Sequence, residues 1–290
     1  MLPRHFYSAV PDIRQLRTTH SWREPRSMTG VAGLDLAEQT AILRKWLPES
    51  LRSRLAARDI YAEACAMNGA EGYGPTEAVL LYAFIATQRP THVLQVGAGV
   101  STAVILAAAD DFGLDLKLSC VDPYPTALLR RLAVSGRIDL IEERGQDVPL
   151  ETFTALPAGG LLFVDSTHTV KPDSEVNRIV LEILPRLSAG VVVHFHDISL
   201  PYDYPRDLLD GALFFWTESV LLHAFLIHNS RCRVLLATSV LHYAASDKLS
   251  EVVPGYQPEQ DVAGLRISGA PKGHFSSAAY LLIHDGDNIT

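Results

Sequence analysis

The segment His92–Thr102, HVLQVGAGVST, decides the fold, because it combines a buried strand, a glycine turn and the start of a helix. Gly97 and Gly99 can take backbone angles that other residues avoid, and they leave room for a ligand against the main chain. Ser101 and Thr102 can cap the helix that follows. In an open parallel sheet, ligands bind beyond the carboxyl ends of the strands. The segment therefore predicts a cofactor at the first strand-to-helix turn of such a sheet.

Apolar runs of strand length alternate with helical segments on both sides of this turn. Strands are expected at residues 92–96, 116–121, 138–142, 161–164, 191–195, 233–238 and 278–283, and helices at 76–88, 101–109, 126–132, 150–156, 174–187 and 217–228. Such alternation implies parallel strands joined by crossover helices. We therefore expect an α/β fold with a doubly wound, mainly parallel sheet of seven strands.

The first 75 residues are expected to form an N-terminal helical arm or cap, followed by one domain over residues 76–290. Up to about residue 33 the chain mixes Pro, Arg, Ser and Gly without periodicity. Leu36, Leu43 and Trp46 then have the spacing of a short amphipathic helix, which Pro48 ends. We expect a homo-oligomer, namely a dimer. The arm either covers a pocket or crosses the dimer interface, and the sequence pattern leaves both readings open.

Composition limits the class of protein. The chain has 290 residues, 48% of them hydrophobic, and a net charge of −8 without a cluster of basic residues, so we expect a small-molecule partner and no nucleic acid. The three cysteines have no C-x-x-C spacing, which argues against a disulfide framework or a cysteine zinc site and favours the cytoplasm. The sequence shows no export signal and no run of about 18 uncharged apolar residues, so no membrane contact is expected.

The residues around the glycine turn favour an adenosine cofactor. Asp122 closes the second strand, 25 residues after Gly97, where a carboxylate can accept both ribose hydroxyl protons. The turn Gly97, Ala98, Gly99 lacks the third glycine of the dinucleotide fingerprint, which makes S-adenosylmethionine a better candidate than NAD. Gln146 and Asp147, after the third strand, are candidates for the adenine edge. A turn needed only for packing, and a helix cap at Asp147, are the plain alternatives.

Acids and imidazoles end the fourth and fifth strands, in LLFVDSTH (161–168) and VVVHFHDI (191–198). Asp165, His196 and Asp197 should converge beyond the sheet edge, and together they suit Mg²⁺, Mn²⁺, Fe²⁺ or Zn²⁺ without choosing among them. His194 and His196 face the same side of their strand, and we favour His196 as the ligand because it is nearer the open end. His194 remains an alternative.

Several motifs resemble those of class I S-adenosylmethionine-dependent methyltransferases. HFYSAVPDI, VGAGVST, VDPYP, FVDSTHTVKPDSEVN and HFHDISLPYDYP are similar to a bacterial family of small-molecule O-methyltransferases, over roughly residues 5 to 243. Gln95 departs from the family, which usually carries an acid two residues before the first glycine. The resemblance implies the Rossmann-like methyltransferase fold and a metal held by Asp165 with His196 and Asp197, as in relatives of catechol O-methyltransferase. It also aligns the family's basic residue with His168. The prolines and tyrosines of SLPYDYPRDLL suit either a rigid wall of the acceptor pocket or a packed connection to the next helix.

The resemblance implies metal-assisted O-methylation of a small hydroxylated metabolite or a sugar-containing acceptor. A sulfonium donates its methyl group in line to an oxygen, which must first lose its proton. His168 is then the candidate general base and Asp165 a further catalytic residue, because imidazole titrates near neutral pH. Three alternatives stay open: a metal-independent methyltransferase with a His base, a non-catalytic cofactor-binding protein, and an NAD-dependent oxidoreductase.

Overall fold

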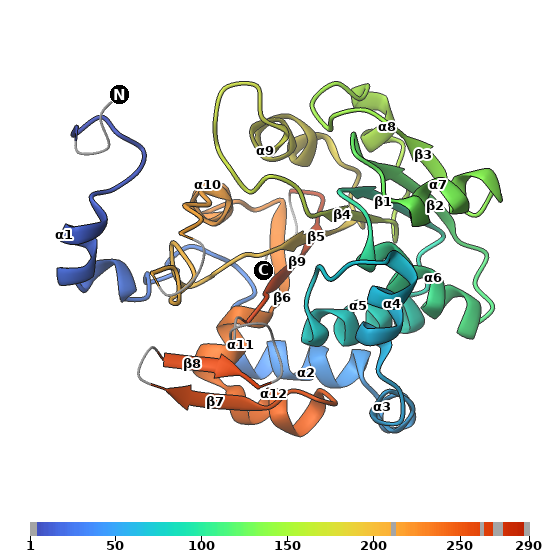
Figure 1. Cartoon of the computed structure of the whole chain (residues 1–290), viewed down its shortest axis with the longest axis horizontal. Helices are drawn as coiled ribbons and strands as arrows, with labels where there is room; N and C mark the ends of the chain where they lie inside the picture. Colours follow the sequence, from blue (N-terminus) through green and yellow to red (C-terminus); the bar gives the residue numbers. More distant parts are fainter. Residues whose placement is uncertain (1–4, 210–212, 262–263, 269–274, 287–290) are drawn as a thin grey trace.

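A seven-stranded sheet forms the centre of the protein in the computed structural model, which describes residues 5–209, 213–261, 264–268 and 275–286 (Figure 1). The strand order is β3-β2-β1-β4-β5-β9-β6. The strands are β1 (His92–Val96), β2 (Lys117–Val121), β3 (Asp139–Ile141), β4 (Leu161–Val164), β5 (Val192–His196), β6 (Cys232–Ala237) and β9 (Ala278–Ile283). Strands β1 to β5 pair in parallel, and β9 pairs antiparallel with both β5 and β6. The predicted mainly parallel sheet is confirmed.

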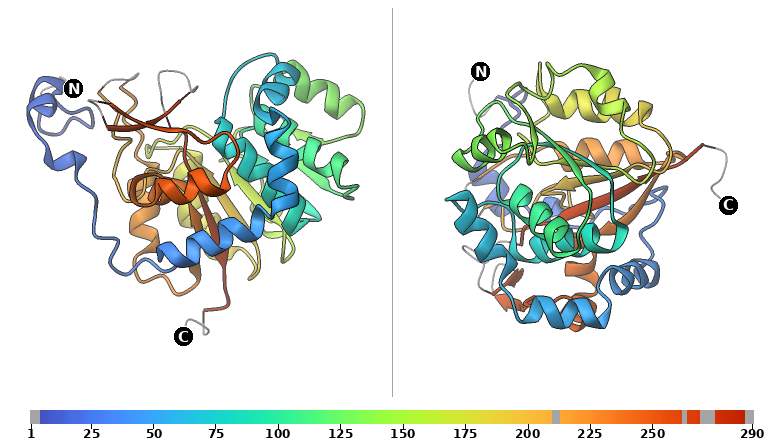
Figure 2. Two further views of the ribbon diagram at one scale, coloured as in Figure 1. Left: turned by 90° about the horizontal axis from the view of Figure 1, so that it is seen from below. Right: turned by 90° about the vertical axis from the view of Figure 1, so that its right-hand side faces the viewer.

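Helices cover both faces of this sheet and enclose two apolar cores (Figure 2). One face carries α2 (Leu36–Trp46), α4 (Ile60–Asn68), α5 (Pro75–Gln88), α6 (Val100–Asp111), α7 (Ala127–Val134), α11 (Thr238–Ala244) and α12 (Ser246–Val252). The other carries α8 (Leu150–Thr154), α9 (Glu175–Arg178) and α10 (Glu218–Leu226). Successive strand residues point to opposite cores, as Phe163 and Val164 do, because side chains alternate along a strand.

Two regions differ from the predicted helices. The single helix expected over 174–187 divides into α9, a π-helical turn at Ile179–Ile183 and a 3₁₀ turn at Leu184–Arg186. Pro185 supplies the reason, because it has no N–H to donate to the helical ladder. The sequence analysis also missed helices α3 (Glu49–Ala56), α4, α11 and α12, and a hairpin of β7 (Pro258–Asp261) and β8 (Gly264–Ile267).

The N-terminal region is helical, as expected, and its parts differ in how they pack. Helix α1 (Ile13–Thr18) lies at the edge of the molecule, away from the sheet, in Figure 1 and in the left view of Figure 2. Helix α2 instead buries Leu43 and Trp46, and the Trp46 ring contacts Phe84 and Tyr280. The division of the chain at residue 75, like the dimer, stays a prediction. None of the helices in the described residues is long and apolar enough to cross a membrane.

Candidate active site

The glycine turn after β1 lies directly against the backbone at the end of β4. Gly97 has φ +82°, and a Cβ atom there would stand 1.6 Å from the carbonyl oxygen of Asp165. The Asp165 N–H donates to the Val96 carbonyl at 2.9 Å. Only glycine fits this position, because both its backbone angle and its neighbour exclude a side chain. The predicted cofactor turn and the first predicted metal ligand are therefore adjacent.

Three polar side chains below the turn hold its shape. Gln95 is fully buried; its Nε2 donates to Ser101 Oγ at 3.0 Å, and its Oε1 accepts from Thr102 Oγ1 at 2.7 Å. Thr102 Oγ1 also accepts the Gly99 N–H at 3.1 Å. An amide serves here because it donates to one hydroxyl and accepts from the other. The departure from the family pattern at Gln95 thus has a structural use.

Asp122 lies at the same turn, whereas Gln146 is bound to another loop and Asp147 pairs within its own loop. Asp122 is half-buried, and its two carboxylate oxygens accept the N–H groups of Ala98 and Tyr124 at 3.3 and 2.8 Å. Gln146 Nε2 donates to the Asp173 carbonyl at 2.8 Å, and Asp147 pairs with Arg144. A carboxylate next to a glycine backbone can accept hydrogen bonds from the ribose hydroxyls of a nucleoside that lies against the main chain. The turn therefore fits the expected nucleoside cofactor.

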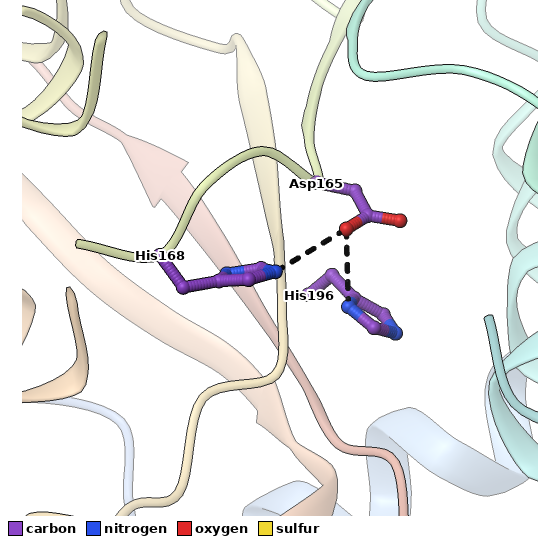
Figure 3. Close-up of side chains that lie close together, drawn as sticks. All are labelled: Asp165, His168 and His196. Atoms are coloured by element: carbon purple, nitrogen blue, oxygen red, sulfur yellow. Dashed lines mark ion pairs between the residues drawn. The ribbon is translucent and has the colours of Figure 1, made fainter. Parts of the chain in front are cut away.

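A cluster of one acid and two imidazoles lies where β4 and β5 end (Figure 3). Asp165 Oδ1 is 3.4 Å from His168 Nε2 and 3.3 Å from His196 Nδ1. Their ligand atoms all lie within 4.8 Å of one another. Asp197 Oδ2 is 3.3 Å from the same His196 nitrogen. Asp165, His168 and His196 therefore meet at one point, and Asp197 joins them through His196. Imidazole and carboxylate together are donors that divalent transition metals accept.

Two further carboxylates, absent from the sequence analysis, lie behind the imidazoles. Glu77 Oε2 is 3.2 Å from His196 Nε2, and Glu218 Oε2 is 2.8 Å from His168 Nδ1. Both side chains are at most 2% exposed. Each imidazole thus directs one nitrogen to the centre and the other to a buried acid, which is how metal-binding histidines are usually oriented.

The buried charges of the cluster perturb one another. Burial would raise the pKa of Asp165, but the imidazoles of His196 and His168 lower it below its ordinary value. Burial would lower the pKa of His168, but its bonds to Asp165 and Glu218 raise it to about 10. The pKa of Glu77 is raised, first by burial. The carboxylates therefore favour positive charge at the centre, in the form of protons or of a cation.

Backbone strain gathers at the same place. Tyr73, His168 and Asp197 all have positive φ, at 62°, 55° and 53°. Residues other than glycine seldom take this conformation, and those that do are often found at functional sites. The ring of Tyr73 also stacks on His196, with centroids 5.1 Å apart. The fold thus holds the backbone of three residues around the cluster in a conformation that is uncommon for residues other than glycine.

His194 belongs to the core beside the cluster. It is fully buried, its Nε2 is 3.0 Å from the Tyr73 hydroxyl, and its ring stacks on Phe163 with centroids 4.4 Å apart. Burial and the nearby His196 lower its pKa to about 3. These contacts favour a neutral, structural imidazole at His194 and leave His196 facing the centre.

Aromatic residues from the loop before α10 border the cluster. The Trp216 ring lies 4.8 Å from that of His168 and stacks on Phe214, which is 55% exposed. The Thr217 and Glu218 N–H groups donate to the His168 carbonyl. This loop therefore fixes His168 while leaving an aromatic surface open to solvent.

One family model and one curated relative match the chain. Residues 94–198 match the model of a family described as a methyltransferase domain. A protein of Archaeoglobus fulgidus with no assigned function is 27% identical over 189 residues, which cover 61% of this chain and 80% of the relative.

Solved structures with low sequence identity were also matched. The SAH-bound methyltransferase PaMTH1 of Podospora anserina is 15% identical, with a TM-score of 0.43, covering 82% of this chain and 97% of its own. The O-methyltransferase TomG of Streptomyces achromogenes, in complex with SAM, is 14% identical, with a TM-score of 0.46, covering 81% and 96%.

Proposed function

Since the chain carries a class I S-adenosylmethionine-dependent methyltransferase domain, we propose that it is a metal-assisted O-methyltransferase. Its acceptor would be a small hydroxylated metabolite or a sugar-containing molecule. One observation carries the proposal: the glycine turn of the cofactor site packs on Asp165, an acid of the candidate metal cluster. Cofactor and cation would therefore share one edge of the sheet.

The cofactor would lie over the turn after β1. Asp122 would accept the ribose hydroxyl protons, Gly97 and Gly99 would leave the main chain open to the nucleoside, and Gln146 with Asp147 would border the adenine. When bound, S-adenosylmethionine supplies a methyl group on a sulfonium cation. Holding the acceptor at reacting distance is the main contribution asked of the protein, and such positioning can be worth up to about 7–11 kcal/mol.

Asp165, His168 and His196 would hold the cation, with Asp197 as a fourth ligand. A divalent cation supplies Lewis-acid stabilisation of an acceptor oxyanion. Two imidazoles among the ligands favour Mn²⁺, Fe²⁺ or Zn²⁺ over Mg²⁺, which prefers oxygen.

His168 serves better as a ligand than as a free base, because both of its nitrogens face carboxylates. Asp165 has the most open side chain of the cluster, at 28% exposed, and would face the acceptor. Because its pKa is lowered, this carboxylate would orient the acceptor hydroxyl and would not take its proton.

The test combines metal analysis, cofactor binding and turnover. We expect the purified protein to contain a divalent metal by elemental analysis, to bind S-adenosylmethionine in calorimetry, and to methylate members of a panel of catechols, flavonoids and sugars. A chelator should abolish turnover while cofactor binding stays within about threefold, and added Mn²⁺ should restore turnover.

The other possible results of this test each favour a different function. Full turnover in chelator would reject the metal and favour His168 as a general base. Cofactor binding without transfer to any acceptor would favour a non-catalytic binding protein. Absence of S-adenosylmethionine binding would overturn the proposal as a whole.

A further inference from the structure

A pocket lies beside the candidate metal cluster. Its lining includes Asp197 and Arg206 from the segment after β5, Tyr243 from α11, Leu265 from β8, and Ser277 just before β9. Asp197 belongs to both the cluster and the pocket. The pocket and the cluster are therefore neighbours that share the Asp197 side chain.

Arg206 is the available cation of this pocket. Its guanidinium carbon lies 5.2 Å from the centre of the Tyr202 ring and 5.7 Å from that of Tyr243. Its Nε is buried without a hydrogen-bond partner, and no ion pair of Arg206 occurs within the described parts of the chain. Asp207 and Arg266 also line the pocket, but both of these have partners.

The aromatic contacts of Arg206 do not occupy its N–H groups, and among the described residues its buried Nε has no hydrogen-bond partner. When a guanidinium stacks on an aromatic ring, the flat face of the guanidinium contacts the ring. Its five N–H groups then point outward in the plane of the guanidinium and can still donate hydrogen bonds. These N–H groups match the two oxygens of a carboxylate in a bidentate pair. A buried N–H without a partner is costly, so a ligand that supplies the acceptor is favoured.

A buried imidazole, that of His242, holds two lining residues of the pocket, Leu265 and Phe275. His242 Nδ1 is 2.7 Å from the Tyr256 hydroxyl, and Nε2 is 3.2 Å from the Leu265 carbonyl. Its ring stacks on Phe275, with centroids 3.9 Å apart. Because the carbonyl can only accept, Nε2 carries the proton and Nδ1 accepts from Tyr256. His242 thereby joins α11 to β8 and to the segment before β9, and the pocket keeps its shape.

We propose that this pocket binds a carboxylate group of the methyl acceptor, through Arg206. The inference rests on the proposed function and adds a substrate class to it: hydroxylated carboxylic acids, with the hydroxyl at the cluster and the carboxylate at Arg206. A carboxylate suits the site better than a phosphate dianion, because Asp197 and Asp207 also line the pocket and would repel a second negative charge.

The test compares two probes that differ in charge alone. The affinities of 3,4-dihydroxybenzoate and its neutral amide, 3,4-dihydroxybenzamide, are measured by calorimetry with the metal-loaded protein and S-adenosylhomocysteine. We expect the wild-type chain to bind the acid roughly 10- to 100-fold more tightly than the amide, the range of a charge-assisted hydrogen bond. Arg206→Gln should bring the two affinities within about threefold, and Arg206→Lys should keep part of the preference.

The control is Arg131→Gln, which removes an exposed arginine of α7 far from the pocket and should keep the full preference. Equal affinities in the wild-type chain, a preference that survives Arg206→Gln, or failure of both probes to bind would each overturn the inference. Thermal melting of each variant excludes unfolding as the cause. Loss of S-adenosylmethionine binding by the wild-type chain would instead count against the proposed function.

Discussion

Glu77→Gln is the sharpest test of the metal cluster, because it removes a charge and almost no volume. Glu77 is fully buried at the start of α5, and its Oε2 lies 3.2 Å from His196 Nε2. If His196 binds a cation through Nδ1, the carboxylate accepts the proton on the other nitrogen and makes the imidazole a stronger donor. Glutamine can still accept that proton, but it supplies no charge.

The expected loss is about 10- to 100-fold in metal affinity, which is the usual effect of changing a carboxylate behind a metal-binding histidine. This corresponds to ~1.4–2.8 kcal/mol. The effect should act on the cation and not on the cofactor, because Glu77 contacts the cluster whereas the glycine turn is held by Gln95. We therefore expect S-adenosylmethionine affinity to stay within about threefold.

Zn²⁺ or Mn²⁺ affinity is measured by competition with a chromogenic chelator at pH 7, and cofactor affinity by calorimetry. Glu182→Gln is the matched control, since Glu182 pairs with Arg186 and is 57% exposed. An affinity of Glu77→Gln equal to that of the control would refute the role given to Glu77. A wild-type chain that binds neither metal would refute the cluster as a metal site.

Two further predictions concern the turn and the pocket wall. Gly97→Ala should abolish S-adenosylmethionine binding in calorimetry, since its Cβ would meet the Asp165 carbonyl, whereas Gly113→Ala, with φ +57° and nothing within 4 Å, should keep it. Burial lowers the pKa of His242 to about 4, so His242 stabilises the folded state above pH ~6.5 and loses that contribution, ~3 kcal/mol, as the pH falls toward 4. Urea unfolding at pH 7 and pH 5 measures the free energy of unfolding. The decrease between the two pH values should be larger in the wild-type chain than in His242→Gln, and an equal decrease in both would contradict the prediction.

The sequence was enough to predict the sheet and the residues at its carboxyl edge, for a physical reason. Each central strand is a short apolar run buried on both faces, and its end is marked by glycine or by a charged residue, as at Gly97, Asp122 and Asp165. Parallel strands bring those ends to one edge. Once the order of the strands is known, the residues that follow neighbouring strands are known to lie next to each other in space.

The acids behind the imidazoles could not be found in this way. Glu77 and Glu218 stand in the first turns of helices α5 and α10, where an acid ordinarily faces water and interacts with the helix dipole. Their burial depends on how α5 and α10 pack, which periodicity does not specify. A usable signal was present at Glu77, because α5 is apolar on all sides and a charge in its first turns has little chance of reaching solvent.

The segment after β5 links the candidate metal centre to the pocket through its backbone. The Asp197 N–H donates to the Ser277 carbonyl at 2.6 Å, and Ser277 Oγ donates to the Ile198 carbonyl at 2.7 Å. Ser239 Oγ, from α11, donates to the same Ile198 carbonyl at 3.0 Å. These hydroxyls satisfy buried carbonyls in a segment that has left the sheet ladder. The position of Asp197 at the cluster and the position of the pocket wall are therefore set by the same bonds, so the distance between an acceptor's hydroxyl and its distal group is a property the fold can select.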